Sequence, residues 1–195
     1  MRSRLGKGGY LAHYERHFEA LADQPIVLLE LGVGTGASLL LWRDYFTRAS
    51  IIGLDENPMV VPDQSGRIKV YQGKQEDLAL LERIGAENAP GGFDVIIDDA
   101  AHVAESARAS FTFLFDRFLK PGGIYAIEDW GTGYWPDWPD GKAFEPNHAH
   151  GMVGFLKELV DEVGARDRGL PESHAPRIVR LEILPGLAFA IRGRR

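Results

Sequence analysis

The chain has 195 residues, 45% of them hydrophobic, with a net charge of −6 and no cysteine. This length suits one domain with a full core, and the negative charge, without a long run of Lys or Arg, argues against a general nucleic-acid binder. The absence of cysteine excludes disulfides and thiolate metal sites, and no apolar run has the character of a signal peptide or of a membrane span of roughly 20 residues, so we expect a cytoplasmic protein that does not bind membranes.

The elements predicted in chain order alternate between apolar strands and amphipathic helices. Residues 1–24 contain an N-terminal helix, with Tyr10, His13, Tyr14 and His17 at helical spacing on one face. Strands are predicted at 25–32, 50–57, 67–73, 93–99 and 123–129, and helices at 36–46, 76–85, 105–119 and 152–164. We expect Gly85 to end the second of these helices and the segment Lys120 to Gly123 to end the third. The sequence pattern over residues 177–193 predicts an antiparallel hairpin around Pro185-Gly186.

This alternation predicts an α/β fold with a mostly parallel seven-stranded sheet, a C-terminal antiparallel hairpin and helices on both faces. Residues 130–150 fall outside the rhythm and form a long loop rich in Trp, Pro and Gly. Loops of this length are usually functional or mobile. Aromatic residues such as Trp138 suggest a lid over a substrate or a pin for the loop, and exposed aromatics here make a homo-oligomer conceivable.

A glycine triplet follows the first predicted strand, at the place where open α/β sheets bind ligands. Gly32, Gly34 and Gly36 are spaced GxGxG, whereas dinucleotide-binding proteins carry GxGxxG. Glu30 precedes the triplet, and Asp55 ends the next strand, where an acid commonly accepts the ribose hydroxyls of a cofactor. These acids favour a cofactor with a positive centre and an amino-acid tail, such as S-adenosylmethionine (SAM), over a nicotinamide cofactor. A tight turn with an exposed Asp is the alternative.

Two neighbouring strands each end in a pair of acids, Asp98-Asp99 and Glu128-Asp129. Adjacent parallel strands lie about 4.8 Å apart, so these carboxylates should converge beside the cofactor, and a hard cation such as Mg²⁺ would relieve their repulsion. Successive strand residues face opposite ways, so we expect Asp98 to point toward the sheet or the helix N-terminus and not toward the ion. The unperturbed pKa of a histidine side chain suits a general base, so His102 is the candidate for that role. The alternative is that the acids cap helices and the histidine lies on the surface.

Between residues 10 and 136 the chain carries the motifs YLAHYERHF, LLELGVGTGASLLLWRDYF, IIGLDEN, RIKVYQGKQED, FDVIIDDAAH and SFTFLFDRFLKPGGIYAIEDWGTGYWP. In order and spacing they resemble the metal-dependent sugar O-methyltransferases of antibiotic biosynthesis, of the macrocin and mycinamicin type. The resemblance implies a Rossmann-like class I methyltransferase fold over a single domain, 1–195. It also implies SAM- and Mg²⁺-dependent methylation of a sugar hydroxyl on a glycosylated natural product.

The resemblance assigns the metal to Asp99, Glu128 and Asp129 and the general base to His102. We expect the cofactor to lie against Glu30, Gly32, Gly34, Gly36, Asp55, Gln75 and Asp99, and the substrate against Tyr14, Tyr134 and Trp135. The chain departs from the family pattern at Lys74 and at Ala100-Ala101. These departures leave a non-catalytic cofactor-binding scaffold as an alternative. A catechol-type O-methyltransferase, which shares the chemistry, is another.

Overall fold

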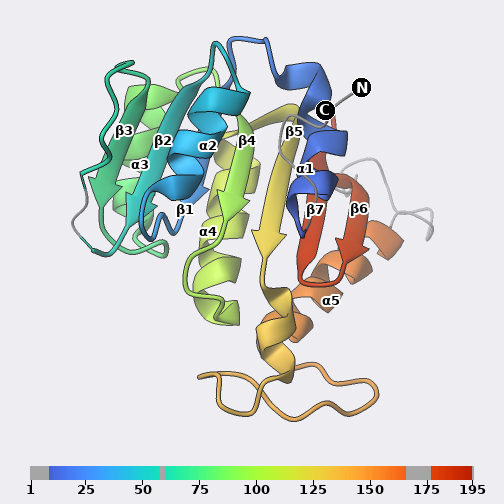
Figure 1. The fold of residues 1–195 in the computed structure, drawn as a ribbon. Coiled ribbons are helices and arrows are strands. Elements are labelled where there is room, and N and C mark those ends of the chain that lie inside the picture. The colour runs from blue at the N-terminus through green and yellow to red at the C-terminus, as the bar shows by residue number, and fades with distance from the viewer. Residues whose placement is uncertain (1–8, 58–59, 166–176, 195) are drawn as a thin grey trace.

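The computed structural model describes residues 9–57, 60–165 and 177–194. Seven strands form one sheet in the order β3-β2-β1-β4-β5-β7-β6 (Figure 1). The strands are β1 (Val27–Leu31), β2 (Ser50–Asp55), β3 (Ile68–Gln72), β4 (Phe93–Asp98), β5 (Leu119–Glu128), β6 (Ile178–Leu184) and β7 (Leu187–Arg192). The first five are parallel, and β7 runs antiparallel to both β5 and β6. The predicted mostly parallel sheet and its C-terminal hairpin are confirmed.

The helices cover both faces of the sheet. They are α1 (Leu11–Phe18), α2 (Ala37–Tyr45), α3 (Leu78–Asn88), α4 (Ala104–Arg117) and α5 (Gly151–Gly164), with short 3₁₀ helices η1 (Glu19–Leu21) and η2 (Trp130–Tyr134). Side chains of α1 and α2 share one buried cluster, and those of α3, α4 and α5 share the other. Alternate residues of β4 divide between these clusters, with Ile96 in one and Val95 and Ile97 in the other, because successive strand residues face opposite sides. None of the helices in the described part of the chain has the length and apolar composition to span a bilayer.

Two predicted helix ends are wrong. Gly85 lies inside α3 and does not end it. A Cβ on Gly85 would lie 2.3 Å from the Phe118 ring, so the glycine permits close packing against the start of β5. The helix predicted over 105–119 ends at Arg117, and the segment from Lys120 to Gly123 belongs to β5. Gly85 and the segment from Lys120 to Gly123 have the composition of turns, but tertiary packing and strand pairing determine the structure at these two places.

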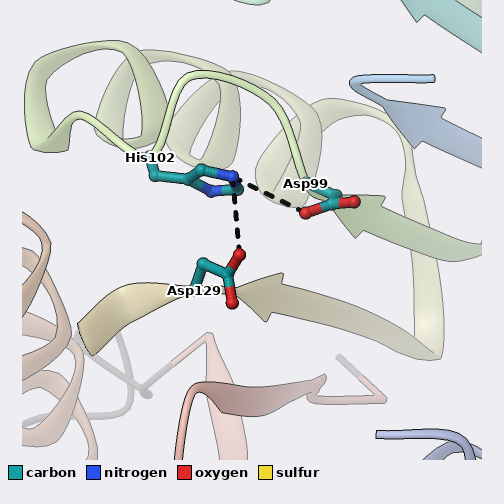
Figure 2. Close-up of side chains that lie close together, drawn as sticks. All are labelled: Asp99, His102 and Asp129. Atoms are coloured by element: carbon teal, nitrogen blue, oxygen red, sulfur yellow. Dashed lines mark ion pairs between the residues drawn. The ribbon is translucent and has the colours of Figure 1, made fainter. Parts of the chain in front are cut away.

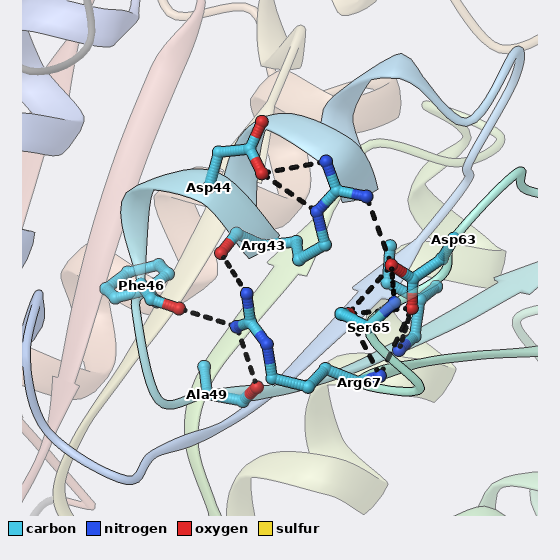
Figure 3. A network of polar contacts seen from close by, with 8 residues as sticks. Arg43, Asp44, Phe46, Ala49, Asp63, Ser65 and Arg67 are labelled. Carbon is cyan, nitrogen blue, oxygen red and sulfur yellow. Dashed lines mark hydrogen bonds and ion pairs between the residues drawn. The ribbon is translucent and has the colours of Figure 1, made fainter.

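At the amino ends of β2 and β3, a polar network joins α2 to the chain before β3 (Figure 3). The Arg67 guanidinium donates to the carbonyl groups of Arg43, Phe46 and Ala49. Asp63 accepts from Arg43 and Ser65. These bonds fix the edge of the sheet opposite the carboxyl ends of the parallel strands.

Candidate active site

The glycine triplet forms the turn between β1 and α2. Gly32 has φ +81° and lies against the loop after β4, since a Cβ there would be 2.1 Å from the Asp99 carbonyl oxygen. Gly34 also has positive φ, +55°, but a Cβ on it would meet nothing within 4 Å. Because order β2-β1-β4 places β1 at the centre, this turn lies at the switch point where α/β sheets bind ligands.

Asp55 at the end of β2 ties this turn in place. Its Oδ2 accepts hydrogen bonds from the main-chain N–H groups of Val33 at 2.8 Å and Gly34 at 2.9 Å, and its Oδ1 accepts from Asn57 N–H at 2.8 Å. Burial opposes ionisation of Asp55, but the main-chain bonds outweigh it and lower its pKa. The carboxylate is therefore charged at neutral pH and holds the turn open beside a pocket.

That pocket is lined by residues from the ends of β1, β2, β3 and β4. They are Gly32, Leu54, Asp55, Glu56, Asn57, Gly73, Gln75, Glu76, Ala100 and Ala101. Three of the predicted cofactor residues, Gly32, Asp55 and Gln75, are among them. Asp77, the residue after Glu76, caps α3 by accepting from Leu80 N–H.

Two of the predicted cofactor residues have side chains that bond inside the protein. Glu30 is 2% exposed, and its carboxyl group accepts from Ser38 Oγ at 3.0 Å and Trp42 Nε1 at 3.3 Å. Burial raises its pKa to about 8. The Gln75 amide nitrogen donates to Asp98, and its oxygen accepts from Ala101 N–H. Through these bonds within the protein, the Glu30 and Gln75 side chains position the chain segments around the pocket.

Asp98 is buried, as its strand alternation predicted. It accepts hydrogen bonds from Gln75, Ser110 and Tyr125, which point it into the core between α4 and β5. Burial raises its pKa to about 6, against these bonds. Asp98 and Asp99 therefore have separate roles: the first anchors the end of β4 and the second faces the site.

Asp99, His102 and Asp129 converge at the carboxyl ends of β4 and β5 (Figure 2). His102 Nε2 lies 3.7 Å from Asp99 Oδ1 and 3.8 Å from Asp129 Oδ2, and one donor atom from each residue lies within 4.8 Å of the others. The three side chains are 37%, 14% and 43% exposed for Asp99, His102 and Asp129. The two carboxylates offer oxygen donors of the kind that binds a divalent cation, and the His102 ring nitrogen lies beside them.

Within the described part of the chain, the ion pairs of Asp99 and Asp129 are those with His102. Burial, followed by the charges of Glu128, Asp129 and Asp98, raises the pKa of Asp99 to about 8. Burial lowers the pKa of His102, although Asp129 and the main chain of Glu128 oppose that shift. A neutral imidazole beside carboxylates is suited to accept a proton.

Helix α1 supports the acids at the end of β5 through two tyrosine side chains on one helix face. Tyr14 Oη donates to Glu128 Oε1 at 2.6 Å, and Tyr10 Oη donates to Asp129 Oδ1 at 2.7 Å. The i, i+4 spacing of the two tyrosines was visible in the sequence, but their partners were not. Tyr14 is 1% exposed, which favours support of Glu128 over the predicted substrate contact. Glu128 lies outside the Asp99–His102–Asp129 group.

The other predicted substrate residues lie on the segment after β5. Trp135 is 53% exposed, and Tyr134 packs against the rings of Phe144 and His148. Substrate contact by Tyr134 and Trp135 stays a prediction.

Gly36 provides the left-handed cap residue of α2, with φ +82°.

Curated relatives match nearly the whole chain. The mycinamicin VI 2''-O-methyltransferase of Micromonospora griseorubida is 35% identical over 95% of this chain and 48% of its own length. The demethylmacrocin O-methyltransferase of Streptomyces fradiae is 35% identical over 94% of this chain and 48% of its own length. No family model matches. The chain is a homologue of sugar O-methyltransferases, and it spans about half the length of these relatives.

A solved relative also has this fold. The MycE methyltransferase from the mycinamycin biosynthetic pathway, in complex with Mg, SAH and mycinamycin VI, superposes with a TM-score of 0.81 at 35% identity. The match covers 95% of this chain and 50% of that one. It confirms both the predicted family resemblance and the class I methyltransferase fold.

Proposed function

We propose that this chain is a methyltransferase domain that transfers a methyl group from SAM to a sugar hydroxyl of a glycosylated natural product, with Mg²⁺. The observation that carries the proposal is the position of the Asp99–His102–Asp129 group, whose loop touches Gly32 of the turn beside the pocket. The solved relative was crystallised with Mg, SAH and mycinamycin VI, a molecule of the proposed substrate class.

The residues fit both cofactors. The open space at Gly34 and the pocket behind it leave room for SAM beside main-chain N–H groups. Asp99 and Asp129 would supply hard oxygen ligands, with Glu128 behind them, and a cation there would offset both the burial and the neighbouring acids that raise the pKa of Asp99. Mg²⁺ bound there supplies a Lewis acid that acidifies a substrate hydroxyl.

The chain's own side chains then provide orientation and a base. His102 accepts the hydroxyl proton at Nε2, the ring nitrogen that faces both aspartates. Transfer of a methyl group from sulfonium to oxygen depends mainly on alignment, which the contact between the glycine turn and the Asp99 loop maintains. A substrate with two neighbouring hydroxyls suits a metal held by carboxylates on one side.

The test is methyl transfer from isotopically labelled SAM to mycinamicin VI, with Mg²⁺ or with EDTA. We expect Mg²⁺-dependent product, loss of turnover of about a hundredfold or more in His102→Ala, and unchanged SAM affinity in that variant. Labelling of a catechol and not of the sugar would indicate the catechol-type alternative. SAM binding with no response to Mg²⁺, and no product, would indicate the scaffold. The cytoplasmic location, the homo-oligomer and the lack of nucleic-acid or membrane partners stay predictions.

A further inference from the structure

His102 has a backbone conformation that is uncommon for a residue with a side chain. Its φ is +50°, in the left-handed region, which costs of order 1–3 kcal/mol and persists only where surrounding structure imposes it. The residues before it, Ala100 and Ala101, are not glycines that would relax such a turn. Something else must hold His102 where its ring meets Asp99 and Asp129.

The segment after β5 binds the His102 main chain directly. Trp138 Nε1 donates to the His102 carbonyl oxygen at 2.8 Å, and Thr132 Oγ1 donates to the same oxygen at 3.2 Å. The Trp138 indole N–H therefore bonds to the protein and is not free for a substrate. The rings of Trp138 and His102 are also 6.0 Å apart.

A third contact fixes the chain two residues later. Asp140 Oδ2 accepts from Ala104 N–H at 2.7 Å, at the first residue of α4. The cap residue of α4, Val103, has no side chain that can accept this bond. Asp140 thus caps α4 from a distant segment, so His102 is held at its carbonyl and just beyond it.

The three holding residues belong to a compact turn structure. Main-chain bonds join Trp138 N–H to Trp135 O and Lys142 N–H to Gly133 O. A Cβ on Gly141 would lie 2.1 Å from the Trp135 carbonyl oxygen, so the segment closes tightly on itself. A folded segment can transmit a fixed position, which a loose lid cannot.

We propose that Thr132, Trp138 and Asp140 form a His102 clamp, a positioning element that sets the left-handed backbone of the base and so the direction of its ring. The clamp deepens the proposed function and rests on it. It assigns part of the 130–150 loop to holding the base, a role distinct from covering the substrate. It also explains how a loop carrying Ala100-Ala101 keeps the base in place.

The test uses Trp138→Phe, which keeps an aromatic ring and removes the N–H donor, and Thr132→Val, which removes the weaker donor at nearly constant volume. We expect kcat to fall about tenfold in Trp138→Phe and about threefold in Thr132→Val, with KM and SAM affinity unchanged. In a His102→Ala background neither substitution should reduce residual turnover further, because the clamp acts through the base. In the metal-free protein, the ¹⁵N-labelled ring signals of His102 should shift in both variants.

Arg67→Lys is the stability control. It removes bonds to three main-chain carbonyls at the opposite edge of the sheet (Figure 3), so the protein should lose stability with kcat unchanged. A kcat within twofold of the wild type in both clamp variants, with unshifted His102 signals, would overturn the clamp. Equal losses with and without His102 would do the same. Full turnover in His102→Ala would instead overturn the role of the base in the proposed function.

Discussion

Asp55 lines the pocket, and Asp99 directly precedes the lining residue Ala100. The surroundings of these two carboxylates are nevertheless opposite. Asp55 receives main-chain N–H groups from Val33, Gly34 and Asn57, and its pKa is lowered. Burial, followed by the charges of neighbouring acids, raises the pKa of Asp99 to about 8. Asp55 is ionised and fixes the glycine turn, whereas Asp99 keeps its proton up to about pH 8 when no cation is bound. An acid at a strand end therefore shows its role through its donors, not through its position.

The largest effect is expected for Gly32→Ala, because Gly32 is the point where the glycine turn contacts the loop that carries Asp99. A Cβ on residue 32 would lie 2.1 Å from the Asp99 carbonyl oxygen, and the backbone there has a positive φ. We therefore expect a loss of about 3 kcal/mol or more in the free energy of unfolding. Urea unfolding followed by circular dichroism measures it. Gly34→Ala, with positive φ but open space, should cost only about 1 kcal/mol. Equal losses would mean that the two regions do not press on each other.

Buried Glu30 provides a test of burial as the cause of a raised pKa. Glu30 has a pKa of about 8 because it is buried, so its protonated form stabilises the fold below its unfolded pKa, and this stability is lost as pH rises from about 4.5 to 8. Glu30→Gln should flatten the pH dependence of unfolding by about 1 kcal/mol per pH unit in that window. Mg²⁺ should leave the difference between the two proteins unchanged, since it acts at Asp99. A difference that Mg²⁺ abolished would place Glu30 in the metal site.

The fold was readable from the sequence because apolar strands and amphipathic helices alternate clearly, and because acids at the ends of adjacent parallel strands must meet. Gly85 was misread because only the tertiary contact with Phe118 shows that a glycine inside α3 is needed. The support of Glu128 by Tyr14, and of His102 by Trp138, joins residues 114 and 36 positions apart. No local pattern specifies such pairs, so the sequence located the reactive groups and missed what holds them.

Matched amide substitutions should move stability in opposite directions. Asp55→Asn weakens the bonds to the glycine turn and should cost about 1–2 kcal/mol. Asp99→Asn removes charge from a crowded group and should stabilise the metal-free protein at pH 9, by no more than about 1 kcal/mol since solvent screens a partly exposed acid. It should also weaken the Mg²⁺ response of turnover sharply. Thermal unfolding in EDTA compares the two, and shifts of the same sign would remove the distinction between these acids.

The smallest expected effect concerns Tyr14, which gives Glu128 the kind of donor that Asp99 lacks. Tyr14→Phe removes the 2.6 Å bond to Glu128, so burial acts unopposed and the pKa of Glu128 rises further. A carboxyl group that holds its proton more tightly supports a cation less well, and we expect Mg²⁺ affinity to fall about fivefold. Competition with Mn²⁺, followed by electron paramagnetic resonance, measures this without turnover. Tyr71→Phe is the matched control, because Tyr71 of β3 donates to Glu87 of α3 at the same 2.6 Å. Equal affinity in both variants would show that α1 packs against the metal site without tuning it, and Glu128 would then belong with Asp55 among the acids that hold the fold.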